Sequence, residues 1–263
     1  MLKSIFAFFV LSLFLISCKK EKSNLEESNF LEVEEKNMGV VAKRTWTGCG
    51  PCGGWGFEYF DDLYLQYGNH AAFMAFKRGF NSVSPMGNTF FERVDDLYGI
   101  GGGTPRFFYN FDTIHGINYS GAGSINTHVN SEVIASANYD FSFVEEKIRV
   151  KTTTKFFTSV EGEYMISPFL ILDNQVGNQA GHDDGPNTVH KKFVADLARP
   201  INTEIVEPWA YKVASGEIEE GYQINLEFEV DRKPDWSAND VSFALILFKK
   251  EGNDYKFVNA FTK

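Results

Sequence analysis

The residues best suited to chemistry are two cysteines, Cys49 and Cys52, which stand two residues apart in the segment TWTGCGPCGGWG, residues 45–56. Such a pair can be a redox centre, half of a metal site or a structural bridge. A structural zinc site requires four ligands, and the five histidines of the chain are not spaced as a second ligand pair. A bridge across two residues closes almost no loop and therefore stabilises a fold little. The spacing favours a redox centre.

The residues around the pair indicate which cysteine would attack a client disulfide and which would resolve the mixed disulfide. An apolar strand precedes the pair and an amphipathic helix follows it, so Cys49 falls at the N-terminus of a helix. Unpaired backbone N–H groups and the helix dipole favour a thiolate there. Cys52 lies one turn further on, where it can resolve a mixed disulfide formed by Cys49. Pro51 suits the first helical turn, which needs no N–H donor at that position.

Strands and helices alternate from residue 38 to residue 137, which predicts an α/β domain. Apolar residues recur every three to four positions in Trp55–Tyr67 and again in 87–100, so both are predicted helices. The other predicted elements are strands at 38–45, 71–80 and 101–112 and a last helix at Ser120–Ala137.

Strand patterns fill the second half, residues 138–263. Segments 141–156 and 222–230 alternate between apolar and polar positions, and Ile148, Val150, Thr152 and Thr154 share one face. Further apolar strands are predicted at 162–173, 241–250 and 255–263. Strands joined by Gly, Pro, Asn and Asp turns predict an antiparallel β-sandwich. The predicted fold class is therefore α/β plus all-β, with a domain boundary between residues 137 and 138.

The N-terminus predicts export and a lipid anchor. An apolar run, Ile5–Ile16, is too short to span a bilayer and has the form of a signal-peptide core. It ends in Ser17-Cys18, which resembles the bacterial lipobox and implies cleavage after residue 17 and lipidation of Cys18. The alternative is an ordinary secretory signal with an incidental cysteine. Several acyl chains on one residue would anchor the protein firmly in a membrane.

Two further features of the sequence concern location and partners. Residues 18–37 are rich in Lys and Glu, and we expect a flexible tether between the lipid and the domains. Lys19, rather than an aspartate, follows Cys18, which favours the outer membrane. The net charge of the chain is -10, so nucleic acid is not an expected partner.

The tetrapeptide CGPC, after a first strand, resembles the active site of thioredoxins. Thr104-Pro105, which follows glycines and precedes RFFY, resembles the thioredoxin loop that carries a cis-proline. The resemblance implies a thioredoxin-like N-terminal domain in which Thr104 and Pro105 bind the substrate backbone beside the cysteines. Trp55, just past Cys52, is expected to shape the rim where a substrate peptide lies.

The sequence departs from thioredoxins at two places. Gly48 stands directly before the first cysteine, where thioredoxins usually have tryptophan. Lys43, followed by Arg44, occupies the place of a buried acid that assists proton transfer. This difference puts thioredoxin-like rates in doubt, and we hypothesise that Lys43 or Arg44 instead stabilises the Cys49 thiolate.

The chain as a whole resembles the Omp28-related outer-membrane lipoproteins of Bacteroidetes. The resemblance rests on the lipobox, the CGPC half and a β-rich half that contains NTVHKKFV, residues 187–194. It implies fold and location more than activity. His190 in that motif is expected to be a packed structural histidine. The nearby cluster of His182, Asp183 and Asp184 is expected to be a polar turn rather than a cation site.

These observations predict an envelope lipoprotein with thiol–disulfide oxidoreductase activity on client protein thiols or disulfides. We expect no cofactor and no metal, and the contact with the membrane is the lipid on Cys18. The alternative is a non-catalytic outer-membrane lipoprotein whose β-sandwich binds an envelope protein or a glycan.

Overall fold

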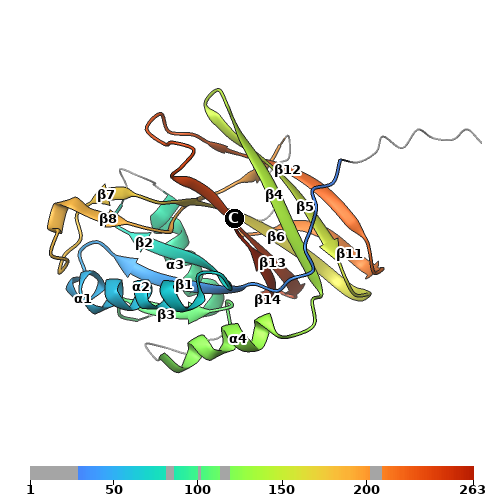
Figure 1. Ribbon diagram of the computed structural model, residues 1–263, viewed down its shortest axis with the longest axis horizontal. Coiled ribbons are helices and arrows are strands. Elements are labelled where there is room, and N and C mark those ends of the chain that lie inside the picture. Colours follow the sequence, from blue (N-terminus) through green and yellow to red (C-terminus); the bar gives the residue numbers. More distant parts are fainter. Residues whose placement is uncertain (1–28, 81–85, 100–101, 113–118, 202–208) are drawn as a thin grey trace, which may run out of the picture.

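The chain folds mainly into β-strands with few helices, and the strands form mixed and antiparallel sheets (Figure 1). The computed structural model describes residues 29–80, 86–99, 102–112, 119–201 and 209–263. The predicted signal peptide and the predicted lipidation site, Cys18, lie outside these residues. The elements in chain order are β1 (Gly39–Trp46), α1 (Gly50–Gly53), α2 (Trp55–Tyr67), β2 (Ala71–Arg78), α3 (Met86–Tyr98), β3 (Arg106–Tyr109), η1 (Tyr119–Ala122), α4 (Gly123–Val129), β4 (Ala135–Val144), β5 (Lys147–Phe156), β6 (Val160–Leu172), β7 (Gln175–Gly177), η2 (Gly185–Asn187), β8 (Thr188–His190), β9 (Phe193–Leu197), β10 (Arg199–Pro200), β11 (Tyr211–Ile218), β12 (Gln223–Asp231), β13 (Val241–Glu251) and β14 (Asp254–Phe261).

The largest sheet contains strands from both halves of the sequence. Its order is β14-β13-β6-β9-β2-β1-β3, and β11 pairs with β6 outside this path. β1 and β2 run parallel, whereas β3 is antiparallel to β1. β2 pairs in parallel with β9 at Ala75 and Phe193. This sheet therefore combines strands from before and after the domain boundary that the sequence predicted between residues 137 and 138.

Alternation along β1 directs its side chains into two different cores, because successive side chains of a strand point to opposite faces. Val41 packs with Phe60 of α2 and Ile125 of α4 on one face of the sheet. Val40 packs with Phe90 of α3 on the other face. The helices α2 and α3 therefore cover opposite faces of the parallel part of the sheet.

A second, four-stranded sheet has the order β10-β12-β5-β4 and is antiparallel throughout. It packs against the β6, β13 and β14 end of the large sheet through aromatic rings. The ring of Tyr139 on β4 lies 5.7 Å from that of Phe243 on β13, measured between centroids, and Phe156 on β5 lies 5.1 Å from Tyr164 on β6. The predicted inward face of β5, from Ile148 to Thr154, is buried. The strand-rich second half is therefore observed, and its arrangement as a separate sandwich domain stays a prediction.

The predicted helix at Ser120–Ala137 is wrong beyond residue 129. The helix α4 ends at Val129, and the side chain of Asn130 donates a hydrogen bond back to the carbonyl oxygen of Asn126 at 2.7 Å. The chain then re-enters a sheet as β4, where Ala135 pairs with Phe156 of β5. Strand pairing in this buried sheet outweighs the local apolar period of three to four.

The described part of the predicted tether, residues 29–37, is docked rather than free. The backbone N–H of Leu31 donates to Thr153 Oγ1 on β5 at 2.9 Å, and Asn138 on β4 donates to the carbonyl oxygen of Glu32 at 2.7 Å. Val33 and Asn37 are buried despite the charged residues around them. The charged composition predicted a flexible segment, but its backbone is bound by hydrogen bonds to side chains of the four-stranded sheet (Figure 1).

Within the described ranges, no helix has both the length and the apolar character that a bilayer crossing requires.

Asn259 on β14 joins three parts of the chain and is fully buried. Its Oδ1 accepts a hydrogen bond from the N–H of Met38 at 2.8 Å. Its Nδ2 donates to the carbonyl oxygen of Lys36 at 2.9 Å and to that of Ala135 at 2.8 Å. The side chain thus holds the segment before β1 and the start of β4 against β14.

We expect Asn259→Ala to lower the free energy of unfolding by about 3 kcal/mol, because the buried N–H of Met38, the buried carbonyl oxygen of Ala135 and the partly buried carbonyl oxygen of Lys36 each lose a hydrogen bond. Urea unfolding followed by circular dichroism measures the loss. The control is Asn126→Ala on the exposed side of α4, which should change stability by less than about 0.5 kcal/mol. Equal losses in the two variants would contradict the assigned role of Asn259.

Candidate active site

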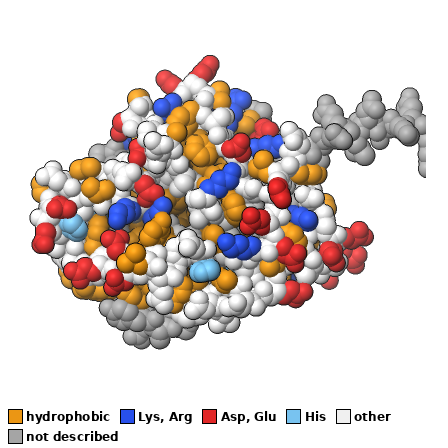
Figure 2. Space-filling model, viewed as in Figure 1, with side chains coloured by type: hydrophobic (Ala, Val, Ile, Leu, Met, Phe, Trp, Pro, Cys, Tyr) orange, Lys and Arg blue, Asp and Glu red, His pale blue; other side chains and the backbone are white. Residues whose placement is uncertain are grey.

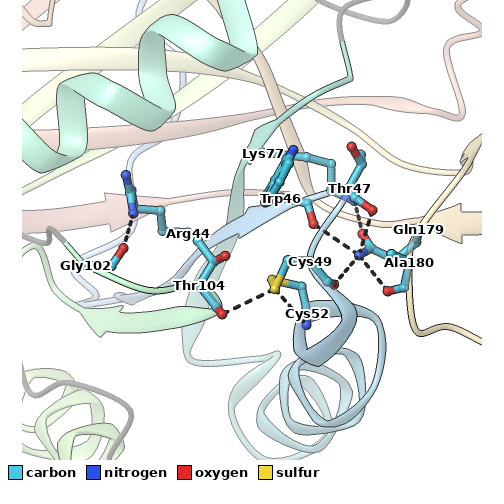
Figure 3. The surroundings of a disulfide bond; sticks show 10 residues. All are labelled: Arg44, Trp46, Thr47, Cys49, Cys52, Lys77, Gly102, Thr104, Gln179 and Ala180. Carbon is cyan, nitrogen blue, oxygen red and sulfur yellow. Dashed lines mark hydrogen bonds between the residues drawn. A yellow bond between two sulfur atoms is a disulfide. The ribbon is translucent and has the colours of Figure 1, made fainter.

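Cys49 and Cys52 form a disulfide where the chain leaves β1 and enters its first helix (Figure 3). Cys49 is the N-cap residue of α1, and the backbone N–H of Cys52 points at its Sγ at 3.2 Å. Cys49 keeps 8% of its surface exposed, whereas Cys52 is fully buried. The small exposed surface of the pair therefore belongs to Cys49 and not to Cys52.

The sequence forms this turn for local reasons. The N–H of Cys49 donates to the carbonyl oxygen of Trp46 at 3.1 Å, which turns the chain directly after β1. Pro51 occupies the first helical turn, where its missing N–H has no partner to lose. Gly54 has non-helical backbone angles, so the short α1 ends there and α2 begins at Trp55.

Thr104 and Pro105 lie beside the disulfide. The Sγ of Cys49 is 3.3 Å from the carbonyl oxygen of Thr104, and the Thr104–Pro105 peptide bond is cis. A disulfide sulfur carries no proton, so this is a contact in the oxidised protein, and a Cys49 thiol would donate a hydrogen bond across it. A Cβ on Gly56 of α2 would lie 2.7 Å from Pro105 Cγ, so the absent side chain lets the proline ring approach the helix. The structure thus brings together Cys49, Cys52, Thr104 and Pro105.

Two tryptophans near the disulfide have exposed rings. Trp55, a predicted rim residue, is 36% exposed at the start of α2 and packs against Phe107 of β3. Trp46, which the sequence analysis did not assign to the site, is 45% exposed. Its ring lies so close to Gly48 that a Cβ there would be 2.7 Å from it. Aromatic surface is therefore available on both chain segments that flank the cysteines.

Lys43 and Arg44, predicted to tune the pKa of Cys49, point to opposite faces of the sheet. Arg44 lies on the α3 face, where its Nη2 is 2.9 Å from Asp95 Oδ2. Its Nη1 donates to the carbonyl oxygen of Gly102 at 3.3 Å, two residues before Thr104. Asp95 compensates the guanidinium charge, and the hydrogen bond to Gly102 holds the loop that carries Thr104. The sequence already indicates this arrangement, because adjacent residues of a strand point to opposite faces of the sheet.

Gln179 is a site residue that the sequence analysis missed. It is fully buried, and its Nε2 lies 3.2 Å from the carbonyl oxygens of Trp46 and of Cys49. The same nitrogen is 3.4 Å from the carbonyl oxygen of Thr47, whose oxygen also accepts the N–H of Ala180 at 2.8 Å. One side chain from the segment between β7 and β8 therefore holds the backbone of the cysteine turn (Figure 3).

The segment around Gln179 lies directly on α1, and two glycines permit this approach. A Cβ on Gly53 would collide with the carbonyl oxygen of Ala180, and a Cβ on Gly181 would collide with that of Gly50. Gly181 also has a φ of +77°, which favours glycine. The segment joining β7 and β8 is thus part of the wall around the cysteines.

Lys43 and Lys77 form a buried cationic cluster with His190 on the α2 face of β1 and β2. All three residues are at most 3% exposed. Lys77 Nζ hydrogen-bonds to His190 Nδ1, and His190 Nε2 donates to the carbonyl oxygen of Gly177 at 3.2 Å. His190 is therefore packed and hydrogen-bonded, as expected. Lys77 was recognisable as a charged residue inside an otherwise apolar strand.

Burial decides the protonation of this cluster. It lowers the pKa of Lys43 to about 7, against a smaller opposing effect of Asp61. Burial and then the charge of Lys43 place the pKa of Lys77 well below its usual range. Burial and then the charge of Lys77 lower the pKa of His190 to about 3. Each group loses hydration, and the two lysines oppose one another's charge.

His182 and Asp184 lie in a turn that continues into η2. The N–H of Gly185 donates to the carbonyl oxygen of His182 at 3.0 Å, and the N–H of Asp184 donates to His182 Nδ1 at 3.2 Å. Over the residues that the structure describes, His, Cys, Asp and Glu do not gather in threes in a way that could hold a metal ion. The turn is a structural part of the wall beside α1.

Comparison with protein-family models finds no match, and comparison with curated proteins finds none either. Among solved structures, the fold is similar to that of HBP35 of Porphyromonas gingivalis, with a TM-score of 0.65 and 17% identity over 88% of this chain and 76% of that chain. A domain of the outer membrane lipoprotein Omp28 from Porphyromonas gingivalis also matches, with a TM-score of 0.30 and 8% identity over 49% of this chain and 86% of that chain. The likeness to HBP35 shows a shared fold.

We expect Gln179→Ala to lower the free energy of unfolding by about 2 kcal/mol, because the fold loses the hydrogen bonds from this buried side chain to the carbonyl oxygens of Trp46 and Cys49. Urea unfolding of the oxidised protein measures the loss. The matched control is Gln66→Ala on the exposed side of α2, with an expected change below about 0.5 kcal/mol. A Gln179→Ala variant as stable as the control would show that the clamp contributes nothing.

Lys43→Met should change how stability depends on pH. The pKa of Lys43 is about 7 in the fold, below the usual 10.5 expected in the unfolded chain. Between these two values the unfolded chain binds more protons, so this group makes wild-type stability rise with pH. Below pH 7 the fold carries the full cost of the buried ammonium, and Lys43→Met removes that cost.

The stability gained by Lys43→Met should therefore be largest below pH 7 and shrink towards pH 10, by at most about 5 kcal/mol at about 1.4 kcal/mol per pKa unit. Urea unfolding at a series of pH values measures the difference from wild type. Lys212→Met, on an exposed side chain of β11, is the control and should give a flat difference. A flat difference for Lys43→Met as well would mean that Lys43 titrates normally.

Proposed function

We propose that this protein is a thiol–disulfide oxidoreductase of the cell envelope with a thioredoxin-like site. The observation that carries the proposal is the Cys49–Cys52 disulfide at a helix start, with Cys49 more exposed than Cys52 and its sulfur 3.3 Å from the carbonyl oxygen of Thr104. The order of strand, cysteine pair, helix and Thr-Pro loop supports a thioredoxin-like unit over residues 38–137, followed by a sandwich over 138–263.

The chemistry is an exchange of two electrons between two pairs of sulfurs. In the reduced protein, the Cys49 thiolate attacks one sulfur of a client disulfide, forms a mixed disulfide and releases the other client sulfur as a thiolate. The Cys52 thiolate then attacks Cys49 Sγ, re-forms the Cys49–Cys52 bond and releases the second client sulfur. The client disulfide is reduced to two thiols and the protein dithiol is oxidised. The reverse sequence oxidises a client dithiol, and the compartment sets the direction.

The surroundings of the pair suit these roles. The N–H of Cys52 points at Cys49 Sγ and would stabilise a thiolate there. The burial of Cys52 keeps it from client proteins, so it reacts within the protein only. Thr104 and Pro105, with the exposed rings of Trp55 and Trp46, are the groups that would contact a client peptide. The hypothesis that Lys43 stabilises the thiolate stays a prediction.

We further propose that the protein is an Omp28-related lipoprotein, held at the outer membrane by lipid on Cys18. The signal-peptide core, the Ser17-Cys18 junction and the NTVHKKFV motif support this location. Disulfides of exported proteins form and persist in such an oxidising compartment, so client disulfides would be available there.

We expect the reduced protein to accelerate the reduction of insulin disulfides by dithiothreitol, measured as the onset of turbidity. Cys49→Ser should lower the rate to that of dithiothreitol alone, because no other sulfur can attack. Cys52→Ser should accumulate a mixed disulfide with the client, visible on a non-reducing gel. Ser142→Ala on the exposed side of β4 is the control and should retain the full rate.

A wild-type protein that does not exceed dithiothreitol alone would overturn the catalytic proposal. Retention of the rate by Cys49→Ser would do the same. In either case the pair is a resting bridge, and the alternative of an envelope lipoprotein that binds a protein or glycan takes its place.

A further inference from the structure

A pocket of about 200 Å³ lies between α2 and the β7–β8 hairpin, on the α2 face of β1 and β2. The side chains at its rim are charged and paired with one another. Lys191 Nζ is 3.7 Å from Asp61 Oδ2, and His182 Nδ1 is 3.7 Å from Asp184 Oδ2. Figure 2 shows acidic, basic and hydrophobic side chains next to one another on the face over α2 and this hairpin. At the rim, Lys191 therefore compensates the charge of Asp61, and Asp184 lies beside the His182 ring.

The interior of the pocket contains two buried lysine amines, those of Lys43 and Lys77, that form no ion pair with a described Asp or Glu. Lys43 Nζ lies 4.6 Å from the ring centroid of Phe57 and 4.2 Å from that of Phe60. Lys77 Nζ lies 5.7 Å from the same Phe57 ring. Among the described residues, no Asp or Glu forms an ion pair with either lysine, and Lys43 makes no hydrogen bond through Nζ. Lys43 Nζ therefore lies at the pocket without a hydrogen-bond acceptor among the described residues.

An unpaired buried cation is costly, and it can be relieved in two ways. The amine can lose its proton, or an anion can enter and supply the missing charge. Aromatic rings beneath Lys43 contribute some attraction but do not replace a counter-ion. Lys77 Nζ already forms hydrogen bonds with His190 and Gln179. An anion that enters the pocket would accept hydrogen bonds from Lys43 and from the remaining N–H of Lys77.

The lining indicates which anion fits. Besides the lysines, the pocket presents the rings of Phe57 and Phe60 and the side chains of Ala75 and Val189. Its volume is below the roughly 300–1,000 Å³ of pockets for drug-sized ligands, so the occupant is small. The lining is mixed, because Asp61, Asp184 and Lys191 also contribute to it. Apolar side chains next to two lysines suit a carboxylate on a short apolar tail better than a fully hydrated oxyanion.

We propose that this pocket binds a small monocarboxylate, whose oxygens contact Lys43 and Lys77 and whose tail packs against Phe57, Phe60 and Val189. The site is distinct from the sulfur of Cys49, and it does not depend on the proposed oxidoreductase activity. Loss of insulin reduction in a cysteine variant would leave it untouched.

Binding should be linked to proton uptake. The titratable and charged groups that face the lysines are Asp61 of α2, His190 of β8, His182 and Asp184 of the turn before η2, and Lys191 after β8. Because the amines are poorly protonated when the pocket holds no anion, a bound carboxylate stabilises their charged form and draws protons from the buffer. Proton uptake is a readout that a purely apolar ligand site would not give.

The test is isothermal titration calorimetry of the full chain with its disulfide intact, near pH 7.5. The probes are butyrate, acetate and inorganic phosphate, in two buffers of different ionisation enthalpy that contain neither carboxylate nor phosphate. We expect one site per chain, tighter for butyrate than for acetate or phosphate, with a heat that differs between the buffers. Lys43→Met should weaken butyrate binding by about tenfold or more, as for the loss of a charged hydrogen bond.

Two further variants keep the test decisive. Val189→Asp places a carboxylate at a half-exposed position of the pocket wall, where it should weaken butyrate binding without disturbing the core. Lys212→Met, on the exposed surface of β11, should bind butyrate as the wild type does. The proposal is overturned if butyrate does not bind, if phosphate binds as tightly as butyrate, or if Lys43→Met binds butyrate normally.

Discussion

The parallel pairing of β2 with β9 is the contact on which the site depends. The N–H of Ala75 donates to the carbonyl oxygen of Lys192 at 2.6 Å, and this joins strands from the two halves of the chain in one sheet. Because β8 ends two residues before Lys192, the pairing fixes the β7–β8 hairpin beside α1. The hairpin in turn brings Gln179 to the cysteine turn and His190 to Lys77. The second half of the chain, which the sequence predicted to be a separate domain, therefore contributes the β7–β8 segment to the wall of the candidate active site.

Charge in this region is governed by burial and pairing together. Arg44 and Lys43 are neighbours in sequence, yet Arg44 is held by Asp95 and two carbonyl oxygens, whereas Lys43 lies under aromatic rings without an anion. A guanidinium keeps its charge under such conditions, and an amine can give up its proton. The two faces of β1 therefore carry different electrostatics: a paired cation that positions the Thr104 loop, and a pair of lysines whose protonation responds to what enters their pocket.

Much of the local structure could be predicted from sequence because it depends on short-range patterns. The helix at Trp55–Tyr67 was read correctly from apolar spacing, and the strand pattern of β5 from its alternation. Contacts between distant segments could not be read in this way. Lys77 and His190 are 113 residues apart, and nothing near Gln179 signals that it holds the cysteine turn. The helix predicted at Ser120–Ala137 failed for the same reason, since pairing with β5 decides where β4 begins.

The docking of residues 29–37 has a geometric consequence for a protein that is tied to a surface by its N-terminus. This segment meets the body of the protein on the four-stranded sheet, whereas α1 lies at the other end of the molecule (Figure 1). With the proposed lipid on Cys18, the tie would join the body at the four-stranded sheet, at the end of the molecule remote from α1. Cys49 would then lie away from the point of attachment, on the side where large exported chains could approach it with less crowding from lipid head groups.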